Sequence, residues 1–213
     1  MVEPIPFCFN SFCAVSARTR HLLSQAVLLQ IRFTTPDTLA AYRYFQGASF
    51  SEDSSPSIPQ PFCKNLGFIK SFFELLKNGD ENVDIYSYCD QDDIWHLDKI
   101  EKMSKAFEDN NDILLLVSGY HAFSENGGKM VVQQHVQTET EDEVSKVVFN
   151  EKYYQICRPG CTMAFRKKIM PAFLALWKEG TPHDALLWCI ASIQQKLYLH
   201  KGTFIAVSYT HLT

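Results

Sequence analysis

The sequence predicts an α/β domain with a mostly parallel sheet flanked by helices. From residue 65 onward, short buried strands alternate with amphipathic helices, and this alternation is typical of parallel sheets. The chain has 213 residues, of which 46% are hydrophobic and 21% charged. It is therefore long enough to bury the core of one domain. No internal repeat is visible.

The organisation of the chain changes near residue 60. Residues 1–62 are hard to interpret and are expected to be a non-native segment, with a helical-looking stretch at 21–30 and a Ser- and Pro-rich loop at 51–59. Residues 63–205 form the predicted domain. Residues 206–213 are expected to be a non-native tail, so the domain is predicted to be incomplete at both ends.

The first elements of the domain lead into a run of carboxylates. Apolar positions recur at helical spacing over 66–76 and stop before Gly79, which predicts a helix. A buried strand is predicted at 83–89. A second amphipathic helix follows, with an inward face formed by Leu97, Ile100, Met103 and Phe107.

The remaining elements continue the alternation. A buried strand is predicted at 113–118, with an Asn-Gly-Gly turn at 126–128. The acidic segment 138–146 is expected to be a solvated loop or helix face, and a strand at 162–166 leads into a helix at 167–178. The last predicted helix has an inward face formed by Leu186, Leu187, Ile190 and Ile193.

Composition and charge exclude several classes of protein. The net charge is −4 and no basic patch stands out, which argues against a nucleic-acid partner. Apolar stretches such as 113–117 are far shorter than the roughly 20 residues that span a bilayer. Glu3 and Pro4 stand where a secretory signal would carry basic residues. Seven scattered cysteines without a CxxC pair indicate reduced thiols, so we expect a cytoplasmic protein.

The segment 88–95, Tyr-Cys-Asp-Gln-Asp-Asp-Ile-Trp, contains the main functional signal. Asp90, Asp92 and Asp93 directly follow a buried strand, and ligands of open α/β sheets collect at the carboxyl ends of strands. Three neighbouring negative charges repel one another unless a cation neutralises them. Mg²⁺ commonly completes its shell with substrate phosphates. The sequence therefore predicts Mg²⁺ or Mn²⁺, held by Asp90 and Asp92 and binding a diphosphate.

Three other interpretations of this cluster fit its residue pattern less well. Asp92 or Asp93 fits the N-cap of the next helix, although a cap needs only one carboxylate. Phosphatases of the haloacid dehalogenase type continue Asp-x-Asp with Gly-Thr near the N-terminus, whereas Ile94 and Trp95 follow Asp93 at mid-chain. An EF-hand fails because Trp95 stands where glycine is needed. Trp95 itself fits either a core position or a ring stacked on a sugar or base.

Four motifs follow one another in a recognisable order. They are Asn-Leu-Gly-Phe-Ile-Lys-Ser-Phe at 65–72, Asp-Gln-Asp-Asp-Ile-Trp at 90–95 with Asp-Lys-Ile-Glu at 98–101, Pro-Gly-Cys-Thr-Met-Ala-Phe at 159–165, and His-Asp at 183–184. Together they resemble bacterial family-two glycosyltransferases of the GT-A fold, especially the rhamnosyltransferase-like branch. The resemblance covers residues 63–205 and implies a GT-A-like, Rossmann-like sheet.

The resemblance also implies roles for individual residues. Asp90 and Asp92 match the metal-binding Asp-x-Asp of the family, and Asp93 lies next to them at the diphosphate. The implied donor-binding set further contains Asn65, Gly160 and Cys161.

Asp184 matches the catalytic base of the family. An inverting transfer needs a base for the proton of the acceptor hydroxyl, and it needs charge stabilisation on the departing diphosphate, which a metal supplies. From the residues alone, His183-Asp184 fits an ordinary helix N-cap equally well.

The implied function is metal-dependent inverting transfer of a sugar from a nucleotide-diphosphate donor to a hydroxyl of a surface-glycan or lipid-linked acceptor. A lipid-linked acceptor would bring the protein to the inner face of the membrane as a peripheral protein. The sequence departs from the family where Ile31 and Arg32 stand in place of an acidic pair that contacts the nucleotide base. The alternative is therefore a catalytically incomplete fragment that at most binds sugar nucleotide, and a phosphatase using the same carboxylates is a second rival.

Overall fold

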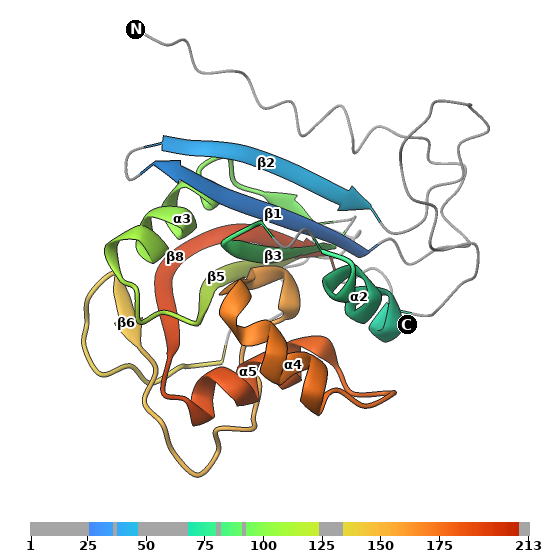
Figure 1. The fold of residues 1–213 in the computed structure, drawn as a ribbon. Helices are drawn as coiled ribbons and strands as arrows, with labels where there is room; N and C mark the ends of the chain where they lie inside the picture. Colours follow the sequence, from blue (N-terminus) through green and yellow to red (C-terminus); the bar gives the residue numbers. More distant parts are fainter. Residues whose placement is uncertain are drawn as a thin grey trace, which may run out of the picture.

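A computed structural model of the protein describes residues 26–35, 38–46, 68–79, 82–90, 93–123 and 134–208, the first two segments by their backbone. Within these residues the chain forms one eight-stranded sheet with helices packed on it, which confirms the α/β class (Figure 1). The strand order is β2 (Thr38–Gln46), β1 (Ala26–Thr35), β3 (Ile85–Asp90), β7 (Met163–Arg166), β5 (Leu115–Phe123), β8 (Leu197–Ser208) and β4 (Ile94–Trp95), and β6 (Val144–Lys146) pairs with β8.

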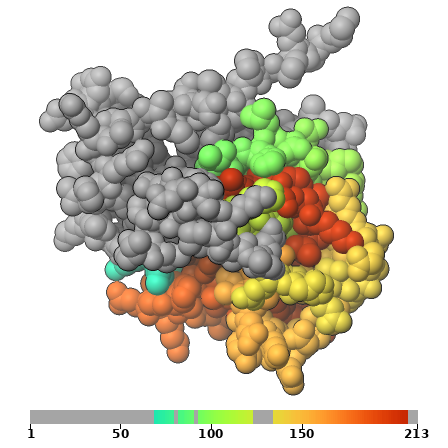
Figure 2. All heavy atoms as spheres, turned by 180° about the vertical axis from the view of Figure 1, so that it is seen from behind, coloured from blue at the N-terminus to red at the C-terminus, as the bar shows by residue number. Residues whose placement is uncertain are grey.

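The α-helices of the described part lie on opposite faces of this sheet. They are α2 (Phe68–Lys77), α3 (Lys99–Asp109), α4 (Met170–Leu176) and α5 (His183–Ile193). Short 3₁₀ turns at Gly160–Thr162 and Lys167–Ile169 flank β7. The first core cluster joins α2, α4 and α5 to one face, and the second joins α3 to the other. Seen from behind, α3 lies directly beside β8 (Figure 2).

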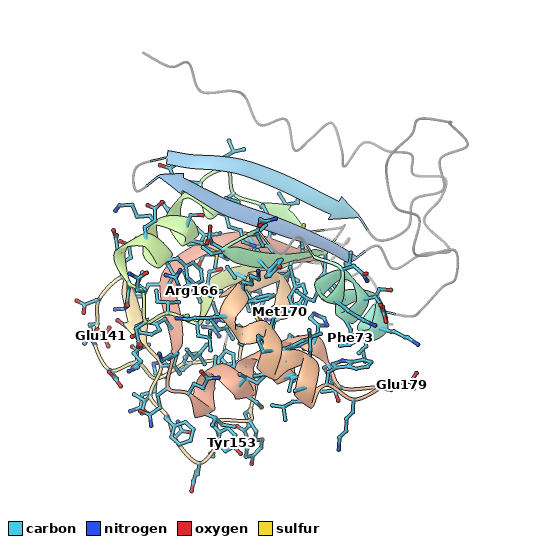
Figure 3. All side chains as sticks on the ribbon, viewed as in Figure 1. Phe73, Glu141, Tyr153, Arg166, Met170 and Glu179 are labelled. Carbon is cyan, nitrogen blue, oxygen red and sulfur yellow. The ribbon has the colours of Figure 1, made fainter. Side chains whose placement is uncertain are left out.

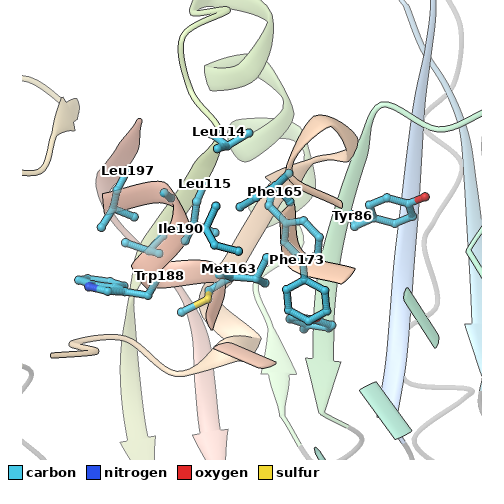
Figure 4. Packing of buried hydrophobic residues seen from close by; sticks show 14 of the residues in the cluster. Tyr86, Leu114, Leu115, Met163, Phe165, Phe173, Trp188, Ile190 and Leu197 are labelled. Atoms are coloured by element: carbon cyan, nitrogen blue, oxygen red, sulfur yellow. The ribbon is translucent and has the colours of Figure 1, made fainter. Parts of the chain in front are cut away.

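The central strands are buried on both faces, which explains their continuous apolar sequences. Along β3, Tyr86 and Tyr88 belong to the first cluster, whereas Ile85 and Cys89 belong to the second. The period of two places successive side chains on opposite faces of the sheet. Figure 4 shows the first cluster, in which side chains of β3, β5 and β7 meet those of α4 and α5.

Strand direction differs from the predicted mostly parallel sheet, because the sheet is mixed. Among the described pairs, β5 and β8 run parallel and the others antiparallel. The reason lies in the turn Gly160–Thr162, which contacts β3 near the end of that strand. A strand that starts there runs back across the sheet, so β7 is antiparallel to both β3 and β5.

Tertiary pairing overrides one local expectation fully and another only in part. The helix expected at 21–30 is a strand over residues 26–30, since β1 forms ladders with both β2 and β3. Residues 21–25 lie outside the described residues. The solvated loop expected at 138–146 is confirmed over residues 139–143, which are exposed and outside any strand or helix, whereas residues 144–146 form β6 and pair with β8.

Two side chains expected to face inward are exposed instead. Leu97 is 87% exposed because α3 begins only at Lys99, so the helical spacing does not extend back to it. Ile193 is 58% exposed because it is the last residue of α5. The predicted inward face of α3 is confirmed at Met103 and Phe107, which are 2% and 0% exposed.

Arg166 fastens the end of α3 to the sheet. Its Nε donates to the Ile113 carbonyl at 3.0 Å, and its Nη2 donates to the Phe107 carbonyl at 2.5 Å and the Asn110 carbonyl at 3.4 Å. A cation at the carboxyl end of a helix also interacts favourably with the helix dipole. Arg166, on β7 and labelled in Figure 3, therefore links the carboxyl end of α3 to the sheet.

The far ends of the predicted domain are only partly described. β8 continues through Ser208, so residues 206–208 of the predicted tail pair with the end of β5. The loop at 51–59 and the turn at 126–128 lie outside the described residues. Within the part that the structure describes, every helix is too short or too polar to cross a membrane.

A pair of truncations on the α3 segment tests the observed packing. We expect Met103→Ala to lower the free energy of unfolding by about 2–5 kcal/mol, because a buried side chain leaves a cavity. Leu97→Ala should change it by less than about 0.5 kcal/mol, because that side chain is exposed. Urea unfolding followed by circular dichroism measures both values. Similar losses in the two variants would contradict the described start of α3.

Candidate functional site

The carboxylates that follow β3 lie against a turn from a distant part of the chain. β3 ends at Asp90, and the Asp93 amide donates to the Asp90 carbonyl at 3.4 Å. β3 pairs with β7, and the turn Gly160–Thr162 immediately precedes β7. Side-chain ligand atoms of Asp90, Asp93 and Cys161 lie within 4.8 Å of one another. These three residues are called the acidic cluster below.

Cys161 is a neutral thiol in this cluster. Burial raises its pKa well above the ordinary value, and the charges of Asp93 and Asp90 add to the effect. The thiol also shares a hydrogen bond with the Asp93 carboxylate. Cysteine binds metals as the thiolate, whereas hard divalent ions prefer oxygen. Asp90 and Asp93 are therefore the described residues of the cluster that suit Mg²⁺ or Mn²⁺, and Cys161 is their hydrogen-bonding neighbour.

Lys99 is a member of the site that the sequence reasoning missed. Its side chain is 0% exposed, and its Nζ donates to the Cys161 carbonyl at 2.7 Å. Burial lowers the pKa of Lys99 to about 8, against the opposing effects of Cys161, Cys89, Asp93 and Asp90. A signal was present in the sequence: Lys99 precedes Met103 by one helical turn, so a charged residue occupies the apolar stripe of α3.

The structure decides between the alternative interpretations of residues 92–95. α3 begins at Lys99 with Asp98 as its N-cap, so Asp93 is not the cap of that helix. Trp95 is 8% exposed and belongs to the second core cluster, and the Lys99 ammonium lies 3.5 Å from the centre of its ring. Of the two interpretations of Trp95, the core position agrees with the structure.

A second group of predicted residues lies on the other side of the same turn. A Cβ added to Gly160 would lie 2.8 Å from Nε2 of His183 and 3.3 Å from Cβ of Asp184. Only a glycine therefore lets the turn approach the start of α5 this closely. His183 is 3% exposed, stacks on Phe72 at 4.1 Å between ring centroids, and meets Tyr88 edge-on at 4.5 Å.

Asp184 lies in the first turn of α5 and is half-buried. Its Oδ1 accepts a hydrogen bond from the Ala185 amide at 2.8 Å, and the positive end of the helix stabilises its charge. The N-cap position belongs to Pro182, so the N-cap interpretation does not describe Asp184. Burial raises the pKa of Tyr88 well above its ordinary value, and the charge of Asp184 raises it further. The base candidate is thus close to the strand that ends at Asp90.

The structure brings most of the predicted site residues to one edge of the sheet. Asp90, Asp93 and Cys161 form the acidic cluster, and Gly160 joins it to Asp184. The other two predicted residues, Asn65 and Asp92, lie outside the described residues.

A cavity of about 280 Å³ lies elsewhere in the molecule. Its walls include Tyr153, Ser192 at the far end of α5 and Leu197 at the start of β8. The acidic cluster, by contrast, lies near the first residue of α5 and beyond the end of β3. None of the described site residues lines this cavity.

A comparison with curated proteins finds a similar enzyme. The chain is 26% identical over 171 residues to the dTDP-rhamnosyl transferase RfbG of Shigella flexneri. The match covers 78% of this chain and 55% of that relative, so the chain spans about half the length of the protein it matches. This similarity supports a glycosyltransferase family. No family model matches the chain.

The buried imidazole of His183 predicts a pH dependence of stability. Burial lowers its pKa from 6.5 to about 4, while Asp184 opposes the shift. The stabilisation is complete above pH 6.5, and we expect the free energy of unfolding to fall by about 3 kcal/mol as the pH drops from 6.5 to 4. The unfolded chain then binds a proton that the buried ring does not. Urea unfolding across this pH range measures the effect.

Two variants separate this contribution from that of the carboxylates, which titrate in the same range. His183→Gln should flatten the profile between pH 6.5 and 4. His96→Gln, at an exposed position, should leave it unchanged. An unaltered profile in His183→Gln would show that the imidazole is not held neutral by the fold.

Proposed function

We propose that this chain carries the donor site and the catalytic base of a metal-dependent inverting glycosyltransferase of the GT-A type. A sugar moves from a nucleotide diphosphate to a hydroxyl of a surface glycan or a lipid-linked acceptor. The observation that carries the proposal is the convergence of carboxylates on one turn. Asp90 and Asp93 lie at Cys161, and Asp184 lies at the adjacent Gly160.

The donor in this proposal is a dTDP-sugar. The similar curated protein is a dTDP-rhamnosyl transferase, and the motif order of the chain resembles the same branch. A lipid-linked acceptor would place the reaction at the inner face of the membrane. The dTDP-sugar rests on the similar curated protein, and the lipid-linked acceptor rests on the resemblance of the motifs.

The acidic cluster suits a hard divalent ion shared with a diphosphate. Asp90 and Asp93 offer carboxylate oxygens close together, and we assign Asp92 to the same ion from the sequence. Mg²⁺ and Mn²⁺ prefer oxygen ligands of this kind and complete their coordination with substrate phosphates. When bound, the ion would stabilise the charge on the departing nucleoside diphosphate.

Asp184 takes the role of general base in this proposal. His183, the other titratable side chain at the start of α5, is only 3% exposed and so out of reach of an acceptor. Its burial lowers its pKa to about 4, so the ring is neutral. It packs against Phe72 and Tyr88, which holds the first turn of the helix in place. Asp184 is half-buried next to Gly160, so an acceptor hydroxyl that approaches the turn meets a carboxylate.

The alternative is a protein that binds sugar nucleotide without transferring the sugar. Ile31 and Arg32 occupy the position where the resemblance places an acidic pair that contacts the base. Both lie in β1, where Ile31 pairs with Ile85 of β3. Turnover of a dTDP-sugar distinguishes the two functions, because the alternative predicts binding alone.

Calorimetric titration with dTDP and UDP, with and without Mn²⁺, tests the donor site. We expect binding that requires Mn²⁺ and that weakens at least about tenfold in Asp90→Asn and in Asp93→Asn, since each variant removes a charged oxygen ligand. Asp92→Ala extends the test to the carboxylate outside the described residues. Asp109→Asn, which alters an exposed acid at the end of α3, should bind like the wild type.

Two results would count against this site. Binding that needs no metal, or that survives both cluster substitutions, would show that these carboxylates hold no ion. If the protein releases phosphate from p-nitrophenyl phosphate and Asp90→Asn abolishes that activity, the result would favour a phosphatase that uses the same cluster.

Removal of the proposed base should separate catalysis from binding. We expect Asp184→Asn to lower kcat for dTDP release from dTDP-rhamnose, with glycan acceptors present, by roughly 10²–10⁴-fold. Affinity for dTDP and Mn²⁺ should stay within about twofold, because the carboxylate is not part of the acidic cluster. Glu179→Gln, on the exposed segment before α5, serves as the matched control. Retention of wild-type kcat would remove Asp184 from the mechanism.

A further inference from the structure

Lys99, the first residue of α3, is a charged side chain without solvent exposure. Its ammonium donates to the Cys161 carbonyl at 2.7 Å and lies 3.5 Å from the centre of the Trp95 ring. Lysine is almost never fully buried unless its charge is compensated. One carbonyl and one aromatic ring compensate a buried ammonium only in part, so the neighbouring acids must contribute.

The acidic cluster supplies these compensating charges. Cys161 binds the ammonium through its carbonyl, and its side chain lies within 4.8 Å of the ligand atoms of Asp90 and Asp93. Burial lowers the pKa of Lys99 to about 8, and both carboxylates oppose that shift. The contacts of Nζ with the Cys161 carbonyl and the Trp95 ring are those of a protonated lysine, so Lys99 carries its positive charge here. A protein cation thus lies beside the cluster before any ion binds.

A fixed positive charge affects a bare ion and a metal–diphosphate complex in opposite directions. It repels free Mn²⁺, and it attracts a Mn²⁺–pyrophosphate complex, whose net charge is negative. A cluster with Lys99 in place consequently holds the bare ion weakly and the complex more strongly. By linkage, the diphosphate raises the affinity for the ion, and the ion raises the affinity for the diphosphate by the same factor.

We propose that Lys99 is a positioning residue that makes the acidic cluster accept a divalent cation as its diphosphate complex in preference to the bare ion. It does so by binding the Cys161 carbonyl, which fixes the turn beside the carboxylates, and by limiting the negative charge around the ion. The proposal rests on the metal–diphosphate site proposed above. It adds the coupling between the two ligands and names the residue responsible.

A purely structural Lys99 would behave differently. If only its contacts with Cys161 and Trp95 mattered, Lys99 would be a structural link between α3 and the turn before β7. Its loss would then disorder the cluster and weaken every ligand together. The charge mechanism instead requires that the affinities for a cation and for an anionic complex move in opposite directions.

The experiment compares Lys99→Met with Lys102→Met at pH 7. Both substitutions delete one positive charge from α3, but Lys102 is half-exposed and pairs with Asp98 at the surface. The probes are free Mn²⁺ and the preformed Mn²⁺–pyrophosphate complex, each titrated by calorimetry. Pyrophosphate carries no base, so the result does not depend on nucleotide recognition. Thermal melting reports whether each variant is folded.

We expect the wild type to bind the complex at least about tenfold more tightly than bare Mn²⁺. Compared with the wild type, Lys99→Met should bind bare Mn²⁺ about tenfold more tightly and the Mn²⁺–pyrophosphate complex about tenfold more weakly. Even in a water-like dielectric, a neighbouring unit charge shifts the affinity for a doubly charged ligand by about this factor. Lys102→Met should match the wild type within about twofold. Lys99→Arg keeps the charge and should keep the wild-type preference.

Parallel weakening of both probes in a folded Lys99→Met variant, or no change in either, would overturn the charge mechanism. If Lys99→Met does not fold, two other results overturn the charge mechanism. One is a Lys99→Arg variant that binds bare Mn²⁺ more tightly than the complex. The other is a wild type that binds bare Mn²⁺ as tightly as the complex. A wild type that binds neither probe refutes the metal–diphosphate function itself. A wild type that prefers the complex, with an unchanged Lys99→Met variant, refutes only the role of Lys99.

Discussion

The antiparallel pairing of β3 with β7 is the constraint on which the candidate site depends. It sets the end of β3, at Asp90, beside the turn Gly160–Thr162 that precedes β7. The buried hydroxyl of Ser87 donates to the Met163 carbonyl at 2.8 Å and reinforces the pairing between the two strands. Because that turn faces the carboxylates at Cys161 and α5 at Gly160, one strand pair positions both halves of the site.

The energetic cost of the arrangement lies in its buried charges. Asp93 and Lys99 are both almost fully buried, and an isolated charge of either kind would be strongly disfavoured in the interior. Their mutual proximity offsets part of that cost. On the other side of the turn, the buried titratable group is uncharged. His183 stays neutral and is held by aromatic packing against Phe72 and Tyr88. The same turn therefore joins a charged region to an apolar one.

Much of the fold could be predicted from the sequence, and the failures in strand assignment share one cause. Local periodicity predicted the buried strand before the carboxylates, at 83–89 against the observed Ile85–Asp90. It also predicted the buried positions Met103 and Phe107 of α3, but it wrongly added Leu97 to that face. The direction of β7, the strand at 26–35 and the pairing of β6 depend on hydrogen bonds to segments distant in sequence. Local patterns carry no record of such partners, so sequence reasoning could not assign them.

For the site, the sequence by itself determined the residue types: carboxylates after a buried strand, a Gly-Cys pair before another, and a His-Asp pair at a helix start. These are local features, because each follows from the order of residues along one segment. Only the tertiary structure decided that Gly160 lies against Asp184 and that the Lys99 ammonium lies beside the acidic cluster, on the Cys161 carbonyl. Contact between distant segments is set by sheet order and core packing. The same packing decides how deeply Lys99, a charge on the apolar stripe of α3, is buried.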